Sequence, residues 1–479
     1  MLRRTLAGLL AASLLAGCDM APKYVRPELP VAPTLPAEAS RGGPAPDGAA
    51  EAPDLAWRDF FVEPRLRDVI ALALADNRDL RVALANVEQA RALYRVQRAD
   101  IFPTLGASGS ATYQKMPGGI PSTGTGTGGG AAAGGSGRSD IYSASVGVSA
   151  WEIDLFGRVR NLSRAALEQY LATAENRNAA QTALIAEVAT AWLTMAADQD
   201  RLAIAQKTEQ AAAQTLELTR ARLAKGIASE LDVRQAQTIF DQASVDIAQT
   251  TTLVAQDRNA LNLLAGTTVS AAMLPDGLGD RNATLDRMPA DLSSQILLRR
   301  PDIAAAEHQL RSANANIGAA RAAFFPNISL TAAFGTLSLG LSGLFGDGSS
   351  FWSAAPSAAL PIFDFGRNAG NLRYAEATRD AMVAQYERAV QSAFREVADA
   401  LARRGTIDAQ LTAQTSLRDA ASGAYRLSEA RFRSGIDPFL TTLDSQRALY
   451  GAEQNLVAAR LIREANAVEL YRALGGGLR

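Results

Sequence analysis

Few side chains in this sequence could carry out covalent or metal chemistry. The 479 residues include a single histidine and a single cysteine. A His/Cys metal site or a histidine-activated nucleophile would therefore depend on His308 alone. His308 lies in a helical segment among alanine and glutamate, where a polar surface position is the simpler interpretation. We expect a protein that is not an enzyme and that holds no metal or other cofactor.

Cys18, the only cysteine, has the sequence context of a modification site. Arginines near the start precede an apolar run, residues 6–16, that is too short to span a bilayer. The segment Leu15-Ala-Gly-Cys18 resembles a bacterial lipobox. By that resemblance residues 1–17 are a removable signal peptide, and Cys18 becomes the acylated first residue. Asp19 follows directly, and an aspartate there favours inner-membrane retention in enteric bacteria, so the sequence leaves the sorting open.

The remaining candidate residues lie at turns that repeat at a constant spacing. Gly226 and Gly435 are 209 positions apart, and each follows an arginine by four residues and precedes an isoleucine. The same spacing relates Phe156-Gly157-Arg158 to Phe365-Gly366-Arg367. Further matched positions are Leu231 and Leu440, Gln237 and Gln446, and Gly266 and Gly475. Register kept over this distance indicates an internal duplication.

Each half contains two segments in which apolar and small polar residues alternate. They lie at 104–113 and 142–150 in the first half, and at 328–334 and 352–362 in the second. Residues 118–137, rich in Gly, Ser and Thr, lack a Gly-Lys-Ser/Thr phosphate loop and predict a long hairpin loop. Strands of about ten residues with one apolar and one small-polar face are typical of membrane β-barrels.

Long helices follow each pair of strands. Residues 158–225 contain neither Gly nor Pro and carry an apolar side chain at most seven-residue intervals. They predict one helix of roughly 100 Å at about 1.5 Å per residue. Gly226 ends it, and a second helix returns over 229–264. We expect a helical hairpin in each half, with its tip beside Gly226 or Gly435.

These patterns divide the chain into five parts. They are a signal peptide (1–17), an acylated tether without a core of its own (18–64), a first repeat with a β-hairpin at 103–151 (65–266), a linker (267–300), and a second repeat with a β-hairpin at 326–363 (301–475). A net charge of −1 and a pI near 6.1 argue against nucleic-acid binding. An aromatic content of only 6 % suits long, closely packed helices.

Four amphipathic strands cannot form a closed membrane structure by themselves. Unpaired edges in lipid leave backbone groups without hydrogen bonds, and membrane barrels begin at about eight strands. Two, three or four copies would supply enough strands. The long helical hairpins are too polar for a bilayer, so they must extend into water. A barrel in one membrane with helices projecting from it describes a duct across the periplasm.

The residues that mark these parts resemble the outer membrane factors of tripartite efflux pumps, the TolC-like channels, and in particular the NodT-type lipoproteins that partner RND transporters. The motifs are Cys18-Asp-Met-Ala-Pro-Lys-Tyr-Val-Arg-Pro27, Trp151-Glu-Ile-Asp-Leu-Phe-Gly-Arg158, Leu298-Arg-Arg-Pro-Asp-Ile303 and Phe325-Pro326. The resemblance covers residues 18–475. It implies a homotrimer, with a twelve-stranded transmembrane β-barrel continuous with a barrel of twelve long helices. Residues 267–300 would form part of an equatorial belt.

The resemblance also assigns roles near the helix-turn tips. In the family the periplasmic tips meet an adaptor protein, and inward side chains close the resting pore. The matching adaptor-contacting positions are Arg222, Gly226, Ile227 and Ser229 in the first tip and Arg431, Gly435 and Ile436 in the second. The matching pore-gate positions are Leu440, Asp444 and Arg447. Threefold symmetry would make Asp444 a carboxylate ring that attracts cations; alternatively, the tip glycines only end helices.

The resemblance thus implies a channel that passes drugs, other toxic compounds or metal ions from an inner-membrane RND transporter and a periplasmic adaptor to the outside. It locates the chain in the outer membrane, lipid-anchored and extending into the periplasm, with no nucleic-acid partner. Two alternatives are left open: the exit duct of a type I protein-secretion system, and a periplasmic coiled-coil lipoprotein that has no pore and no strands. The sequence does not identify the exported compound.

Overall fold

A computed structural model describes residues 19–35, 55–115, 138–279, 283–285 and 293–477. Cys18, the signal segment 1–17 and the loop 118–137 lie outside the described residues. Two compact units make up the chain: Met1–Val25, Gln89–Tyr170 and His308–Met382 form unit 1, and Arg26–Glu88, Leu171–Glu307 and Val383–Arg479 form unit 2. Within the described ranges, no helix is long and apolar enough to cross a membrane.

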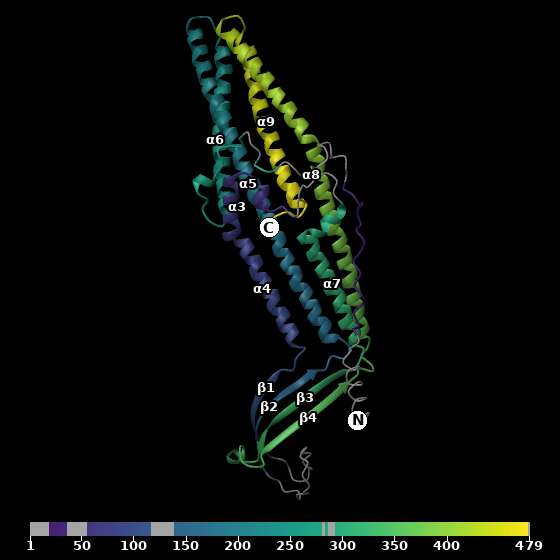
Figure 1. Ribbon diagram of the computed structural model, residues 1–479. Coiled ribbons are helices and arrows are strands. Elements are labelled where there is room, and N and C mark those ends of the chain that lie inside the picture. Colours follow the sequence, from purple (N-terminus) through teal and green to yellow (C-terminus); the bar gives the residue numbers. More distant parts are fainter. Residues whose placement is uncertain (1–18, 36–54, 116–137, 280–282, 286–292, 478–479) are drawn as a thin grey trace. The chain divides into compact units, whose positions relative to one another are not determined.

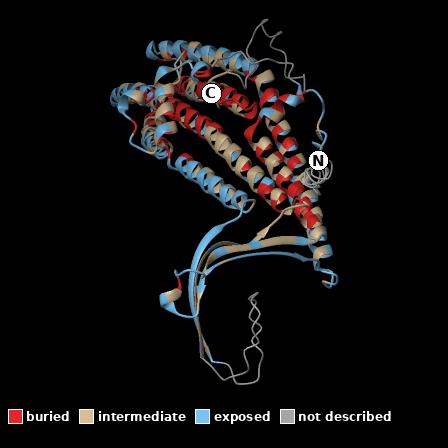
Figure 2. Ribbon diagram, turned by 60° about the horizontal axis from the view of Figure 1, so that its bottom comes forward, coloured by how far each residue is buried: buried red, intermediate tan, exposed pale blue. Residues whose placement is uncertain are grey.

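Unit 1 contains an antiparallel four-stranded sheet in the order β1-β2-β3-β4, so β1 and β4 are its edges (Figure 1). The strands are β1 (Leu105–Lys115), β2 (Arg138–Glu152), β3 (Asn327–Ser338) and β4 (Ser350–Ala359). Each predicted alternating segment overlaps one of them. Residues of the two inner strands are mostly half-buried, whereas those of the two edge strands are mostly exposed (Figure 2).

The strand register gathers apolar side chains of all four strands onto one face. Ala107 pairs with Val146, Val146 with Phe334, and Phe334 with Trp352, which makes one row across the sheet. Directly paired residues share a face, and successive residues of a strand face opposite ways. On the other face, serine hydroxyls lie 2.8 Å apart in the pairs Ser110–Ser143 and Ser329–Ser357. The sheet thus has an apolar face and a face with paired serines.

A β-bulge near the end of β2 changes the predicted alternation. The pairing of β2 with β3 shifts between Val148 and Trp151, and Ala150 has a φ of 50°. The backbone N–H of Ala150 donates to Thr331 Oγ1 at 3.1 Å. Strict alternation through 142–150 predicts that Ala150 shares the apolar face with Val148. That prediction is wrong, because the extra residue of the bulge moves Trp151 into that position opposite Leu330.

Two helical hairpins of nearly equal length follow the strand pairs. The helices α5 (Arg158–Ala224) and α8 (Arg367–Arg433) each have 67 residues, and α6 (Glu230–Ala265) and α9 (Phe439–Ala473) have 36 and 35. Gly405 and Gly423 lie inside α8 without interrupting it. The other elements are α2 (Trp57–Phe60), α3 (Pro64–Asp76), α4 (Arg78–Ala99), α7 (Pro301–Ala322), η3 (Ala271–Met273), η4 (Ser294–Arg299) and η5 (Leu341–Gly343).

Matched glycines in the two halves adopt the same left-handed backbone. Gly226 has a φ of 71° and Gly435 one of 75°. The other two pairs are Gly157 with Gly366, at 78° and 84°, and Gly266 with Gly475, at 71° and 85°. After Gly226, the N–H of Ile227 donates to Arg222 O at 2.9 Å, which closes the end of the helix. Since glycine alone adopts this backbone without steric cost, these residues determine where the long helices begin and end.

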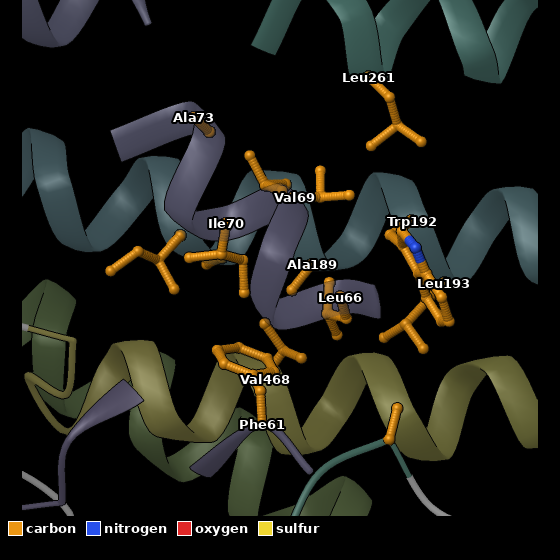
Figure 3. Close-up of a cluster of buried hydrophobic side chains, with 14 of the residues drawn as sticks. Phe61, Leu66, Val69, Ile70, Ala73, Ala189, Trp192, Leu193, Leu261 and Val468 are labelled. Atoms are coloured by element: carbon orange, nitrogen blue, oxygen red, sulfur yellow. The ribbon is translucent and has the colours of Figure 1, made fainter. Parts of the chain in front are cut away.

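An apolar cluster in unit 2 surrounds α3. Leu66, Val69 and Ile70 have no exposed surface, and their spacing places them on one face of that helix. In Figure 3 they lie among Ala189, Trp192 and Leu193 of α5, Leu261 of α6 and Val468 of α9. The cluster therefore joins a short helix of the first repeat to helices from both halves of the sequence.

The Pro-rich N-terminal segment, predicted as a tether with no core of its own, packs side chains into the core of unit 2. Leu35 is buried in a second apolar cluster of unit 2. Trp57, Phe60 and Phe61 are buried in the cluster around α3. The Phe60 ring stacks on that of Tyr471 with centroids 4.0 Å apart. Large aromatic side chains in this segment thus pack against the C-terminal helix.

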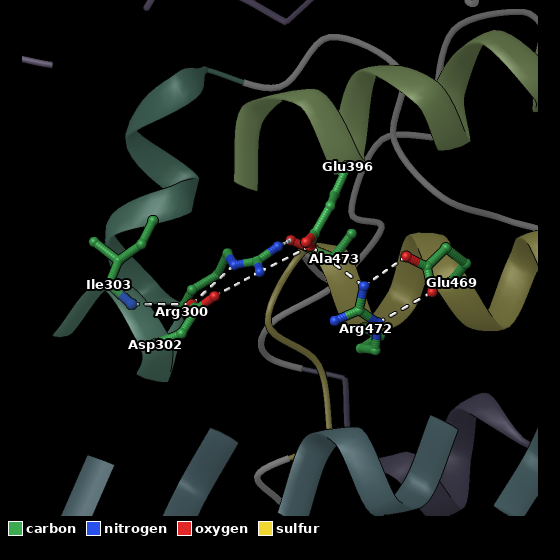
Figure 4. A network of polar contacts seen from close by, with 7 residues as sticks. All are labelled: Arg300, Asp302, Ile303, Glu396, Glu469, Arg472 and Ala473. Atoms are coloured by element: carbon green, nitrogen blue, oxygen red, sulfur yellow. Dashed lines mark hydrogen bonds and ion pairs between the residues drawn. The ribbon is translucent and has the colours of Figure 1, made fainter. Parts of the chain in front are cut away.

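Arg300 links the start of α7 to the end of α9 (Figure 4). Its side chain, 5 % exposed, donates to the Ala473 carbonyl at 2.7 Å and to Glu396 of α8 at 3.0 Å. It also donates to Asp302 Oδ2 at 2.7 Å, while Asp302 Oδ1 accepts from the Ile303 N–H at 2.9 Å. The Arg-Pro-Asp motif therefore shapes a helix start and also holds three helices together.

Candidate functional site

The first helix-turn tip joins α5 to α6 in unit 2. Gly226 forms the left-handed turn, and Ser229 is the N-cap of α6. The Ser229 hydroxyl accepts from the Asp232 N–H at 3.2 Å, and the Asp232 carboxylate accepts from the Ser229 N–H at 2.9 Å. This reciprocal pair satisfies two of the free backbone donors at the helix start. The Ile227 side chain in the turn is 71 % exposed.

The second tip joins α8 to α9 through the same backbone turn but with different chemistry. Its N-cap, Pro438, has no side chain that could cap the helix. Arg431 instead donates from Nε and Nη2 to the two carboxylate oxygens of Asp437, at 2.6 and 2.8 Å. Hydrogen bonding to Arg431 lowers the pKa of Asp437. Ile436 is 62 % exposed, so each tip presents one isoleucine to solvent beside its glycine, Gly226 or Gly435.

The two tips contact each other through Arg222. Its guanidinium carbon lies 4.3 Å from the ring centroid of Phe432, and its Nη2 donates to the carbonyls of Phe432 and Arg433 at 3.0 and 3.1 Å. Below this contact, buried side chains from both hairpins form a small cluster of Leu216, Val233, Ala236, Phe432, Phe439 and Leu443. Arg222, predicted to meet an adaptor, is half-buried and places its charge at the C-terminal end of α8.

The predicted gate residues share one side of α9. Leu440, Asp444 and Arg447 are separated by four and three residues, the spacing of neighbours along a helix surface, and all three are exposed. Thr442, Leu443 and Gln446, which lie on the other side, are buried. The chain thus presents an apolar, a negative and a positive side chain in one exposed row.

Two polar links between helices of unit 2 were not predicted. The Tyr450 hydroxyl of α9 donates to Asp246 Oδ2 of α6 at 2.6 Å, and burial together with that carboxylate raises the pKa of Tyr450. Asp257 of α6 faces Asp198 of α5, and burial followed by the charge of Asp198 raises the pKa of Asp257 to about 6. Neither pair has a signal in the sequence, because the partners lie on separate helices.

Other candidate residues take structural positions in unit 1. The described residues contain no group of three or more side chains arranged as metal ligands. His308 Nδ1 lies 2.6 Å from Glu168 Oε2, which links α7 to α5. Asp154 accepts from the Arg160 N–H at 2.8 Å, and Asp364 accepts from an N–H in the first turn of α8. Both aspartates therefore stabilise helix starts.

An amphipathic antiparallel sheet and two long helical hairpins with glycine-closed tips define a class of outer membrane channel proteins. The chain belongs to the outer membrane efflux protein family, whose sequence model matches residues 69–267 and 292–476. It is the outer membrane component of an efflux pump.

Similar proteins share nearly the whole chain. The toluene efflux pump outer membrane protein TtgC of Pseudomonas putida is 45 % identical over 466 residues, which cover 97 % of this chain and 94 % of that protein. Outer membrane protein OprJ of Pseudomonas aeruginosa is 42 % identical over 98 % of this chain and 95 % of its own length. The crystal structure of the open state of the Neisseria gonorrhoeae MtrE outer membrane channel matches with a TM-score of 0.84 and 39 % identity, covering 96 % of this chain and 99 % of that one.

Proposed function

We propose that three copies of this chain form an exit duct in the outer membrane through which an efflux pump releases small molecules. The three sheets close into a twelve-stranded β-barrel, and the long helices of the three copies form a tube that continues it. Residues 267–300 contribute to a belt around the tube. Cys18, acylated, anchors each copy to the inner leaflet.

One observation carries this proposal: an apolar sheet face that ends in two exposed edge strands. The row from Ala107 to Trp352 crosses all four strands, and Trp352 is 77 % exposed. Such a face is stable in lipid, but open edges there would leave backbone donors and acceptors unpaired. Pairing the edge strands of neighbouring copies satisfies these backbone donors and acceptors at both edges. The family resemblance favours three copies, and the four strands exclude a coiled-coil lipoprotein without strands.

The tips are the proposed contact with a periplasmic adaptor protein, which connects the duct to an inner-membrane RND transporter. Their exposed isoleucines, Ile227 and Ile436, supply an apolar contact on each hairpin. The glycines keep the turns narrow, and Ser229 and the Arg431–Asp437 pair fix the backbone beside them. Arg222 acts from within, by holding the two tips together.

The proposed gate is formed by Leu440, Asp444 and Arg447. In a threefold assembly each of these residues occurs three times at one level of the tube. A ring of Asp444 carboxylates attracts cations and repels anions, and the Leu440 side chains narrow the opening. Small organic compounds are the proposed cargo, since the similar proteins are named for toluene, solvent and antibiotic efflux.

Planar-bilayer recordings on purified assemblies test the channel. The wild-type protein should give small, rarely open conductance steps, and Asp444→Ala should raise the open fraction and reduce cation selectivity. Glu429→Ala, a substitution near the same tip but on α8, serves as the control. Assemblies of three chains that conduct in neither form would contradict the proposal.

A further inference from the structure

The two strand-to-helix junctions of unit 1 have the same sequence pattern but different surroundings. The first junction follows β2 and contains Phe156, and the second follows β4 and contains Phe365, 209 positions later. The Phe156 ring stacks on Phe325 with centroids 4.7 Å apart. Phe365 is 91 % exposed, and within the described residues its ring lies edge-on against the neighbouring ring of Phe363, with centroids 4.5 Å apart. The second junction therefore lacks the partner that the first one has.

The sequence contains the missing partner at the opposite edge of the sheet. Phe325 belongs to a Phe-Pro pair just before β3, and the same pair, Phe102-Pro103, stands just before β1. Phe102 is 61 % exposed. Within one chain, β3, which follows Phe325, pairs with β2, which precedes Phe156. The strand after Phe102 and the strand before Phe365 are β1 and β4, the two free edges in Figure 1.

We propose that β4 of one copy pairs with β1 of a second copy in the register that β2 and β3 already show, and that Phe365 stacks on Phe102 of that second copy. This rests on the proposed assembly of several chains. Phe365 and Phe102 are then each covered by another copy of this chain, and the same contact recurs between every two neighbouring copies of the assembly.

The register follows from the junction. In the first repeat Trp151 is directly opposite Leu330, and the Ile153 N–H donates to Ile328 O at 2.8 Å. The matching residues of β4 and β1 place Leu360 opposite Ala107 of the second copy. They also place the backbone N–H of Ile362 opposite the carbonyl of Leu105 of the second copy. Ile362 is 94 % exposed in the single chain.

The two faces of the sheet give an independent check of this register. In β2, Val148 and Trp151 both lie on the apolar face although two residues separate them, because of the bulge. In β4, Ala358 and Leu360 lie on the apolar face with one residue between them, so this strand needs no bulge. The register without a bulge pairs apolar-face positions of β4 with apolar-face positions of β1. A slip by one residue would place every β1 side chain on the wrong face.

The chemistry at the two junctions also differs as this assembly requires. Glu152 in the first junction accepts from Asn327 Nδ2 at 3.1 Å and pairs with Arg158. Pro361 stands at the position of Glu152 in the second junction, so no such polar link is available there. The contact between copies would be an apolar one, with aromatic rings in place of the ion pair.

Cysteine pairing in membranes tests the register. Leu360→Cys with Ala107→Cys in one chain should give disulfide-linked dimers and trimers on oxidation, because directly paired strand residues have Cα atoms about 5 Å apart. Each single variant should stay unlinked, which also controls for Cys18. Leu360→Cys with Ser110→Cys should link poorly, because Ser110 lies three positions after Ala107 in β1 and on the other face of the sheet. Val146→Cys with Phe334→Cys should close within one chain.

Ring stacking is tested by heat dissociation of the assembly on gels. Phe365→Ala and Phe102→Ala should lower the dissociation temperature by similar amounts, and the double variant should lower it little further, because both remove one contact. Phe345→Ala, which removes an exposed ring in the connection between β3 and β4, is the control. Additive losses would overturn the ring stack, and conducting trimers in which Leu360 and Ala107 do not link would overturn the register. Either result would leave the channel intact. Absence of any conducting assembly would instead contradict the proposed function.

Discussion

Arg222 and Phe432, which are 210 residues apart in the sequence, join the tips of the two helical hairpins. The Arg222 guanidinium carbon lies 4.3 Å from the centroid of the Phe432 ring. The same side chain donates to two carbonyls at the end of α8, where a positive charge is favourable. Each hairpin closes its own turn with a glycine, so the tips are coupled by this contact together with the small apolar cluster next to it. A change in its strength should alter how easily the tips separate.

Replacing Arg222 should loosen the tips. Arg222→Leu removes the cation–π contact and both carbonyl hydrogen bonds, a local loss of about 1–2 kcal/mol. We expect roughly a tenfold higher open fraction in bilayer recordings and faster cleavage of the tips by trypsin. Arg220→Leu is the control, because Arg220 bonds to Gln237 within its own hairpin. Equal behaviour of the two variants would show that Arg222 does not couple the tips.

Asp257 should make the stability of unit 2 depend on pH. Its pKa is raised to about 6 by burial and by Asp198, so the folded chain binds the proton more tightly than the unfolded chain does. The stabilisation is present at low pH and is lost as the pH rises toward and through about 6. Asp257→Asn carries no charge to bury beside Asp198, so it should flatten the change in melting temperature between pH 5 and 7 and melt higher than wild type at pH 7.

The matched substitution for that experiment is Asp241→Asn. Asp241 is exposed and accepts a hydrogen bond from Gln237 on the same helix. This variant should keep the wild-type slope between pH 5 and 7. If Asp257→Asn kept that slope as well, the coupling of Asp257 to Asp198 would not control stability in this range.

A charge on the apolar face of the sheet should block membrane assembly. Val146 lies in the row that we assign to lipid, and Ser145, its neighbour in β2, lies on the other face. Val146→Arg should cost about 2–4 kcal/mol per copy near the middle of a bilayer. We expect loss of heat-resistant assemblies from membranes, whereas Ser145→Arg should still assemble and conduct. The reverse result would assign the serine face to lipid.

Removing Arg300 should destabilise the chain more than any change at the tips. Arg300→Met leaves the Ala473 carbonyl without its buried donor and leaves the Glu396 carboxylate with Arg472 alone, a loss of about 2–3 kcal/mol. Denaturant unfolding of the detergent-purified protein measures it. The neighbouring Arg299 is exposed, and Arg299→Met should cost little. A near-neutral Arg300→Met would mean that the three helices pack without this network.

Local signals made much of the secondary structure predictable. Gly226 and Gly435 lie in left-handed turns because only glycine adopts that backbone freely, and this can be read from residue type and spacing. The predicted helix 158–225 ends within one residue of α5. The bulge at Ala150 escaped prediction, since an extra residue in a strand becomes visible only against its partner. The packing of Trp57 and Phe60 also escaped it, because the prolines around them suggested an extended tether.

The sequence by itself located the long helices and the four strands to within a few residues and indicated the apolar strand face, because these properties depend on neighbours a few residues away. The internal duplication stays a prediction from spacing that can be counted. The tertiary structure decided which side chains meet: Arg222 with Phe432, Asp198 with Asp257, and Phe156 with Phe325. Such contacts join residues from separate helices and strands. Their partners are chosen by packing and register, which no local pattern encodes.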